Sequence, residues 1–206
     1  MRLFSMLFAA IIVIITSIFL ISCISVITFS GYKYTDNPKQ VTIKTIPIVV
    51  DKNFSDNDKA SIKAAIVAWN YSLNGYINLV VESWQFDMEP NVIEYILSRK
   101  GYMVMKIDSK NSIVTTTAGL EDALAFCNDI GGNYMYFIRD RLREADIKYI
   151  ALHEFAHLLG APHVGNNLMY PNYSKYTYQC IDYDTLSAVA SYQNLPVGRL
   201  NYCKYN

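Results

Sequence analysis

The sequence predicts an α+β (α/β-type) domain that follows an apolar N-terminal segment. Short β-branched or apolar runs alternate with stretches of helical periodicity, and all the histidines of the chain lie in one short stretch that begins on a helix. A chain of 206 residues has room for one such domain plus a targeting segment. We therefore expect a single mixed sheet with helices packed against it.

The first strand and helix follow each other directly after the N-terminal segment. A strand is expected over Val41–Val50, which is β-branched and alternates with polar residues before a continuous apolar end. The next helix is predicted by a capping signal at Ser55 and Asp58, by apolar residues at helical spacing up to Trp69, and by an Asn-Gly pair at 74–75 that stops it. Trp69 is expected to be a core residue.

The middle of the chain predicts two more strands with a short helix between them, then two segments that flank a turn, then another helix. The turn is rich in Gly, Asn and Asp, which is typical of a hairpin. In chain order the expected segments are Ile77–Trp84, Val92–Ser98, Tyr102–Asp108, Asp122–Phe126 and Tyr134–Arg139. The helix that follows them is expected to begin near Arg143–Asp146.

The three histidines of the chain lie in one short motif, His153-Glu154-x-x-His157-x-x-Gly160-x-x-His163. Positions i and i+4 of a helix share a face, so His153 and His157 can direct their rings at one ion. A continuous helix would carry His163 about 9 Å further along its axis. The chain must therefore turn at Gly160, which can adopt a left-handed conformation and end the helix.

The residue types in the motif indicate zinc chemistry. Pro162 prevents the helix from resuming, which allows His163 to supply a third ligand. Three imidazole nitrogens suit Zn²⁺ and leave the fourth tetrahedral position for water. Glu154 lies beside the ligand face, where its carboxylate can take a proton from a zinc-bound water. The motif thus predicts one catalytic Zn²⁺ held by His153, His157 and His163, with Glu154 as the general base.

Two other functions compete with peptide hydrolysis. In the first, a structural zinc holds the fold of a membrane-tethered binding module. Closed structural sites use four protein ligands, commonly including cysteine, and no cysteine lies in this stretch. A structural site also has no use for a base such as Glu154. The second alternative is a zinc amidase acting on a non-protein amide, and the motif does not distinguish it from a peptidase.

The motif together with Leu-Met-Tyr-Pro at 168–171 resembles the zinc-binding motif and Met-turn of the metzincin metallopeptidases, most closely the matrixin branch. The resemblance implies a zinc-dependent endopeptidase whose mixed, twisted sheet packs on an N-terminal helix and an active-site helix. It also implies a small C-terminal subdomain with the Met-turn and a final helix, which we expect from Asp182 to Tyr192. Met169 would support the metal site from below. Val164 departs from the serine that matrixins usually place there.

The resemblance also implies a substrate-binding edge strand, for which Gly119–Phe126 is the candidate. Such an edge pairs with the backbone of a polypeptide substrate. Matrixin sites of this region carry calcium and a second, histidine-bound zinc. The second zinc is not expected, because every histidine is already used. Ca²⁺ is one interpretation of Glu121, Asp122 and Asp129, and ordinary solvated carboxylates are the other.

Three of the four cysteines lie in the predicted domain. Cys180 and Cys203 flank the last helix, and in an oxidising compartment a disulfide between them is plausible. Cys127 would then lie outside this pair or have a different partner. A thiolate of Cys127 that shields the zinc is a further hypothesis.

The N-terminus allows three interpretations. Residues 3–29 are almost uninterrupted apolar sequence, and a bilayer needs around 20 apolar residues. The segment could be an uncleaved anchor, a lipoprotein signal cleaved before Cys23 in Leu-Ile-Ser-Cys, or a signal peptide cleaved near Ser30. The first two attach the protein to the membrane, and the third secretes it. All three place the domain outside the cytoplasm.

Composition and charge complete the prediction. Lysine plus arginine equals aspartate plus glutamate at 18 each, so the net charge is zero. No basic run stands out, and binding to nucleic acid is therefore not expected. We expect a signal or anchor at 1–30, a polar linker at 31–40 and a metallopeptidase catalytic domain at 41–206.

Overall fold

A computed structural model describes residues 44–87, 89–174 and 180–203. Within these ranges one mixed sheet has the strand order β2-β1-β3-β5-β4. The first four strands of that order run parallel, and β4 at the edge is antiparallel to β5. The strands are β1 (Lys44–Asp51), β2 (Ile77–Phe86), β3 (Tyr102–Ile107), β4 (Ala125–Cys127) and β5 (Tyr134–Ile138). The predicted mixed sheet is confirmed.

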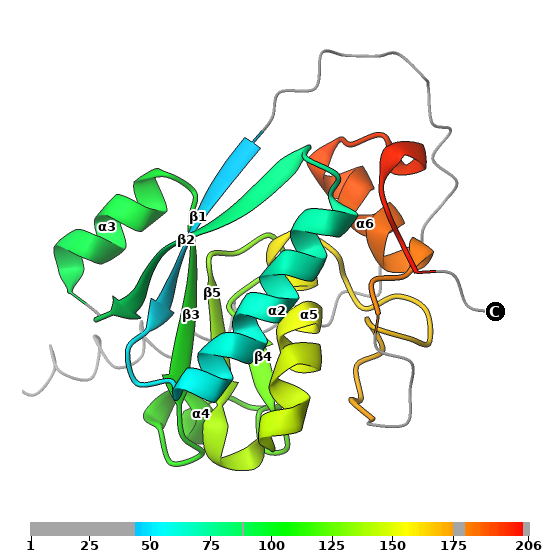
Figure 1. The fold of residues 1–206 in the computed structure, drawn as a ribbon. Helices are drawn as coiled ribbons and strands as arrows, with labels where there is room; N and C mark the ends of the chain where they lie inside the picture. Colours follow the sequence, from blue (N-terminus) through cyan, green and yellow to red (C-terminus); the bar gives the residue numbers. More distant parts are fainter. Residues whose placement is uncertain (1–43, 88, 175–179, 204–206) are drawn as a thin grey trace, which may run out of the picture.

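The helices lie on both faces of this sheet (Figure 1). Two long helices, α2 and α5, pack against each other and cover one face, and α3 covers the other. A further helix, α6, lies near the C-terminus, and α4 is a short helix that the sequence did not predict. The helices are α2 (Asp56–Ser72), α3 (Pro90–Ser98), α4 (Ser112–Thr116), α5 (Ile147–Leu158) and α6 (Tyr183–Gln193).

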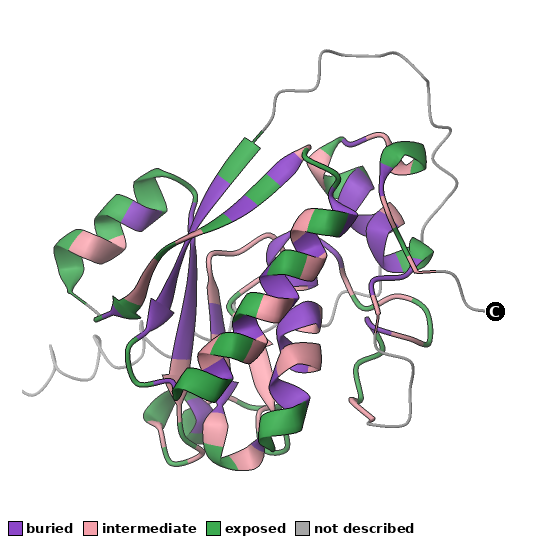
Figure 2. Cartoon of the chain, viewed as in Figure 1, coloured by how far each residue is buried: buried purple, intermediate pink, exposed green. Residues whose placement is uncertain are grey.

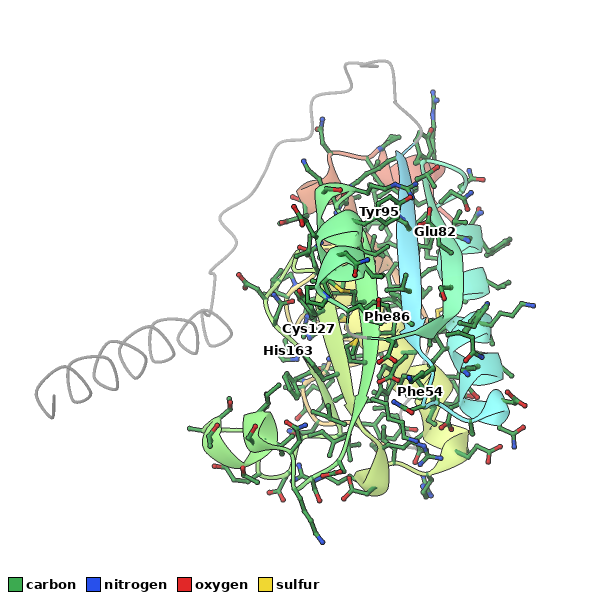
Figure 3. All side chains as sticks on the ribbon, turned by 90° about the vertical axis from the view of Figure 1, so that its left-hand side faces the viewer. Phe54, Glu82, Phe86, Tyr95, Cys127 and His163 are labelled. Carbon is green, nitrogen blue, oxygen red and sulfur yellow. A yellow bond between two sulfur atoms is a disulfide. The ribbon has the colours of Figure 1, made fainter. Side chains whose placement is uncertain are left out.

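The core has two parts that the sheet separates (Figure 2). The larger lies between the sheet and the pair α2 and α5, and it includes the fully buried Trp69 and Phe155. The smaller lies under α3, where Ile96 packs against Phe86 and Met103. Figure 3 views the molecule from this second side and labels Phe86. Because both faces of the sheet are covered, the sequences of its central strands are nearly continuous apolar runs.

The helix α2 begins and ends where the sequence predicts. The Ser55 hydroxyl caps it by accepting a hydrogen bond from the Asp58 N–H at 3.2 Å. Asn74 and Gly75 follow its end with φ of 48° and 80°. The Trp69 indole N–H donates to the Leu152 carbonyl oxygen at 3.1 Å, which joins the two long helices. Trp69 is thus a core residue as predicted, and its hydrogen bond fixes the position of α5 along α2.

An ion pair in the core holds the segment between β5 and α5. Asp58 is buried, and its two carboxylate oxygens accept from the Arg139 guanidinium at 2.9 and 3.1 Å. Arg139 also donates to the Leu142 carbonyl oxygen at 2.6 Å. These bonds tie the start of α2 to the turn that leads into α5, and so help to place the helix that carries the histidines.

The extent predicted for the edge strand is wrong. Of the candidate Gly119–Phe126, only the last two residues belong to β4, which continues to Cys127. The preceding residues form turns and bends. The Arg141 guanidinium accounts for part of this, since it donates to the carbonyl oxygens of Leu120 and Ala123 at 2.8 Å each. Those carbonyls bond to a side chain instead of continuing the strand ladder.

The C-terminal subdomain is held by a cap and a disulfide. Asp182 caps α6 by accepting from the Thr185 N–H at 2.7 Å, as predicted. The predicted Cys180–Cys203 disulfide is confirmed, with Cα atoms 6.3 Å apart. The proposed anchor or signal at 1–30 and the linker at 31–40 lie outside the described residues. Among the helices that are described, none has the length and apolarity that a membrane crossing requires.

Candidate metal centre

The helix α5 brings the first two histidines together. The rings of His153 and His157, one turn apart, have centroids 4.7 Å apart at an interplanar angle of 83°. Their Nε2 atoms are separated by 3.1 Å, so both rings direct the same nitrogen at one point. This is the geometry that the i and i+4 spacing predicts for two ligands of a single ion.

The helix ends at Gly160 as predicted, through a Schellman motif. Gly160 has φ of +102°. Its N–H donates to the His157 carbonyl oxygen at 2.9 Å, and the Ala161 N–H donates back to the Ala156 carbonyl oxygen at 2.8 Å. The carbonyls of the last turn are therefore satisfied, and the chain reverses direction immediately after the second histidine.

After this turn His163 joins the other two histidines. Its ring centroid lies 5.3 Å from that of His153 and 4.7 Å from that of His157. One ligand atom from each of the three residues falls within 4.8 Å of the others. Among the described residues, this trio is the only group of three or more potential ligands that converges in this way. Cys127 is not part of it, so the geometry does not support a zinc-shielding thiolate.

Backbone carbonyls fix the orientation of two of the rings. The Leu168 carbonyl oxygen lies 2.6 Å from Nδ1 of His153, and the Ala161 carbonyl oxygen lies 2.8 Å from Nδ1 of His157. A carbonyl can only accept, so each Nδ1 must carry the proton and each Nε2 keeps its lone pair for a metal. The residue after Leu168 is the fully buried Met169. The segment predicted to be the Met-turn is thus joined directly to a histidine of the cluster.

Electrostatics keep the histidines neutral. Burial, with a smaller contribution from the neighbouring histidines, lowers the pKa of His153 to about 4 and the pKa of His157 to about 3. Burial also lowers the pKa of the more exposed His163. Metal binding requires unprotonated imidazole. Near neutral pH all three rings are therefore in the protonation state that a metal ion needs.

Glu154 is buried beside the cluster, and its carboxylate has a partner on the edge strand. The Cys127 Sγ atom lies 3.1 Å from Oε2 of Glu154 and 3.3 Å from its carbonyl oxygen. Burial raises the pKa of Glu154 to about 7, and the hydrogen bond from the thiol opposes that rise. A carboxyl whose pKa lies near neutrality can both accept and release a proton at physiological pH. No spacing rule predicts this contact, which joins residues 27 positions apart.

The acidic residues considered for calcium do not converge as a group of three. Glu121, Asp122 and Asp129 belong to no converging group of potential ligands in the described part of the chain. Asp129 instead accepts a hydrogen bond from the Ile130 N–H at 2.8 Å.

The match to a protein family agrees with the motif. The model of the matrixin family matches residues 51–192, which include the first helix, the histidine cluster and most of α6. A solved structure, metalloproteinase-II from Bacteroides fragilis, is similar with a TM-score of 0.47 and 16% sequence identity, covering 76% of this chain and 55% of the other. This chain thus spans about half the length of that protein. The search of curated protein sequences found no match to the present chain. The family match covers more than half of the chain and includes the whole motif, so the chain belongs to the matrixin family of metalloendopeptidases.

Proposed function

We propose that this protein is a zinc-dependent endopeptidase in which His153, His157 and His163 hold the metal and Glu154 is the general base. The observation that carries the proposal is the convergence of three neutral imidazoles, two of them oriented by backbone carbonyls. The donor set fits Zn²⁺, because three protein nitrogens that leave one position open are typical of catalytic zinc sites. A zinc ion held there would acidify a water molecule and polarise the carbonyl of the substrate.

The chain's own residues then account for the proton transfers. Glu154 accepts a proton from the attacking water and delivers it to the leaving amine, which is a task for a carboxyl with a pKa near neutrality. Met169 and the Leu168 carbonyl support the cluster from the side of the core. The Ala161 carbonyl holds the second histidine in the same way. The metal site is thus supported by the two segments that follow α5.

The proposed substrate is a polypeptide that lies along β4. This strand pairs with β5 on one side and forms the edge of the sheet on the other. It also contacts α5, which carries His153 and His157. An extended substrate that pairs with this edge would bring its backbone past the metal centre through hydrogen bonds that do not depend on sequence.

We also propose that the enzyme acts outside the cytoplasm, held at the membrane by its apolar N-terminal segment or released from it. The Cys180–Cys203 disulfide supports an oxidising compartment. The apolar stretch at 3–29 supports an anchor, a lipoprotein signal or a cleaved signal peptide. Mass determination of the mature N-terminus distinguishes these, since only the lipoprotein form begins at a lipidated Cys23.

The test of the function compares the zinc-loaded wild type with Glu154→Gln and His157→Ala. Each protein is incubated with a denatured protein mixture and, separately, with peptidoglycan, and the products are identified by mass spectrometry. We expect the wild type to cut polypeptides, Glu154→Gln to keep bound zinc and lose cleavage, and His157→Ala to lose both.

Three other results would change the assignment. Full cleavage by Glu154→Gln would remove that residue as the base. Products from peptidoglycan alone would favour the amidase. A wild type that cuts nothing, yet melts at a lower temperature when a chelator removes zinc, would favour a structural metal in a binding module.

A further inference from the structure

The hydrogen bond between Cys127 and Glu154 lies between the edge strand and the helix of the metal centre. Cys127 ends β4, opposite Met135 of β5. Its Sγ atom reaches across to α5, where it lies within hydrogen-bonding distance of both the carboxylate and the carbonyl oxygen of Glu154. Figure 3 labels Cys127 on its strand. The strand proposed to hold the substrate is therefore in direct contact with the residue proposed as the base.

The chemistry of this contact determines which group donates. A thiol has one proton to give, whereas an ionised carboxylate can only accept. A carbonyl inside a helix already has an N–H partner four residues on. The charged oxygen is the stronger acceptor and also lies nearer, at 3.1 Å against 3.3 Å for the carbonyl. The thiol proton therefore goes to Oε2 of Glu154.

A donor at that position has a consequence for catalysis. A glutamate side chain has three rotatable bonds, and a general base must hold one oxygen toward the water it deprotonates. Engagement of Oε2 restricts the rotation of the carboxylate and leaves Oε1 to face the reaction. Removal of a hydrogen bond that orients a metal ligand costs roughly ten- to a hundredfold in activity, and we expect an effect of similar size for a hydrogen bond that orients the base.

We propose that Cys127 is a positioning residue of this enzyme, whose thiol orients the Glu154 carboxylate by donating a hydrogen bond to Oε2. This inference rests on the proposed function of Glu154. Cys127 is neither a metal ligand nor a nucleophile in this role. The placement of the donor on β4 also means that the base is aligned by the same strand that pairs with the substrate.

The first test measures steady-state kinetics of full-length Cys127→Ala and Cys127→Ser, with zinc content and melting temperature recorded for each. Alanine removes the donor, whereas serine keeps an O–H in nearly the same place. We expect Cys127→Ala to lower kcat roughly ten- to a hundredfold at unchanged KM and zinc content, and Cys127→Ser to recover most of the loss. An equal loss of kcat in both variants, a change in KM without a change in kcat, or full activity of Cys127→Ala would contradict the proposal.

The second test needs no activity. The S–H stretching band is recorded by Raman spectroscopy on the metal-free protein, with Cys23→Ser as background so that Cys127 supplies the remaining thiol beside the disulfide. We expect the band at a lower frequency in this protein than in the same protein carrying Glu154→Ala, because donation to a carboxylate weakens the S–H bond. An unchanged band refutes donation to the carboxylate, because the backbone carbonyl of residue 154 is present in both proteins.

The two tests separate failure of the inference from failure of the proposed function. If the zinc-loaded wild type cleaves no polypeptide, the endopeptidase assignment fails, and the catalytic role of Cys127 fails with it even when the band shifts. If the wild type is active and Glu154→Gln is not, but Cys127→Ala is as active as the wild type, then only the positioning role is wrong.

Discussion

Substitution of Gly160 by alanine tests whether the turn after the second histidine depends on the absence of a side chain. Two separate effects oppose an added methyl group. The φ of +102° is unfavourable for any residue with a Cβ, at a cost of about 1–3 kcal/mol. The new Cβ would also overlap the ring of Tyr192 on α6 and would lie 2.7 Å from the Tyr192 Cβ atom. Rotation of the ring cannot move that Cβ, so α6 itself must shift, and overpacking of this kind costs about 1–3 kcal/mol more.

Gly75 provides a matched control for this prediction. Its φ is +80°, but a Cβ there would meet no atom within 4 Å. Gly75→Ala should therefore lower the free energy of unfolding through backbone strain alone, and Gly160→Ala should lower it by about 1–3 kcal/mol more. The assay is urea denaturation of the metal-free proteins, with m-values compared to confirm that the unfolding transition is the same.

A third variant separates the two effects within Gly160 itself. Tyr192→Ala in the Gly160→Ala background removes the ring but leaves the Tyr192 Cβ in place, so we expect only partial recovery of stability. Zinc affinity of Gly160→Ala should fall as well, since the residues after the turn carry His163. Equal destabilisation by Gly160→Ala and Gly75→Ala would refute the reasoning, because it would show that the contact with α6 contributes nothing.

Three further predictions concern stability. Burial raises the folded-state pKa of Glu154 from 4.5 to about 7, so the stability this group contributes is present below pH 4.5 and is lost as the pH rises toward 7. The free energy of unfolding of metal-free Glu154→Gln, measured by urea denaturation, should therefore rise relative to that of the wild type between pH 4.5 and 7. A constant difference between the two proteins across this range would contradict the prediction. The double variant Cys180→Ser, Cys203→Ser lacks the disulfide, which closes a loop with a sequence separation of 23. Its free energy of unfolding should be lower than that of the wild type by about 3 kcal/mol. A melting temperature of the wild type that does not change on reduction would contradict this. Asp58→Ala removes the buried carboxylate that accepts from the partly exposed Arg139 guanidinium, and it should lower the free energy of unfolding by about 1.5–3 kcal/mol in the same denaturation assay. A loss below about 1 kcal/mol would show that water replaces the pair.

Local features of the chain were predictable because their causes are local. The spacing of His153 and His157 is a property of one helical turn, and Gly160 ends the helix through its own φ. The caps at Ser55 and Asp182 likewise involve an N–H only three residues away. Strand and helix positions followed from periodicity, with differences of a few residues at their ends.

The edge strand shows where local reasoning fails. The strand is shorter in the structure than predicted, in part because the Arg141 guanidinium binds carbonyl oxygens that a longer strand would have used. The five-strand order, with β4 antiparallel at the edge, is equally a matter of which segments meet. Periodicity describes which face of a strand is buried but not its neighbours.

The convergence of the three histidines therefore follows from the sequence alone, through residue types at spacings that one helix and one turn convert into geometry. Only the tertiary structure decided what surrounds that centre. The carbonyl oxygens of Leu168 and Ala161 that orient two imidazoles, and the Cys127 thiol against Glu154, come from segments that no spacing rule relates to their partners. The physical reason is that a contact between distant residues depends on how the sheet and helices pack, and this packing is a property of the whole core.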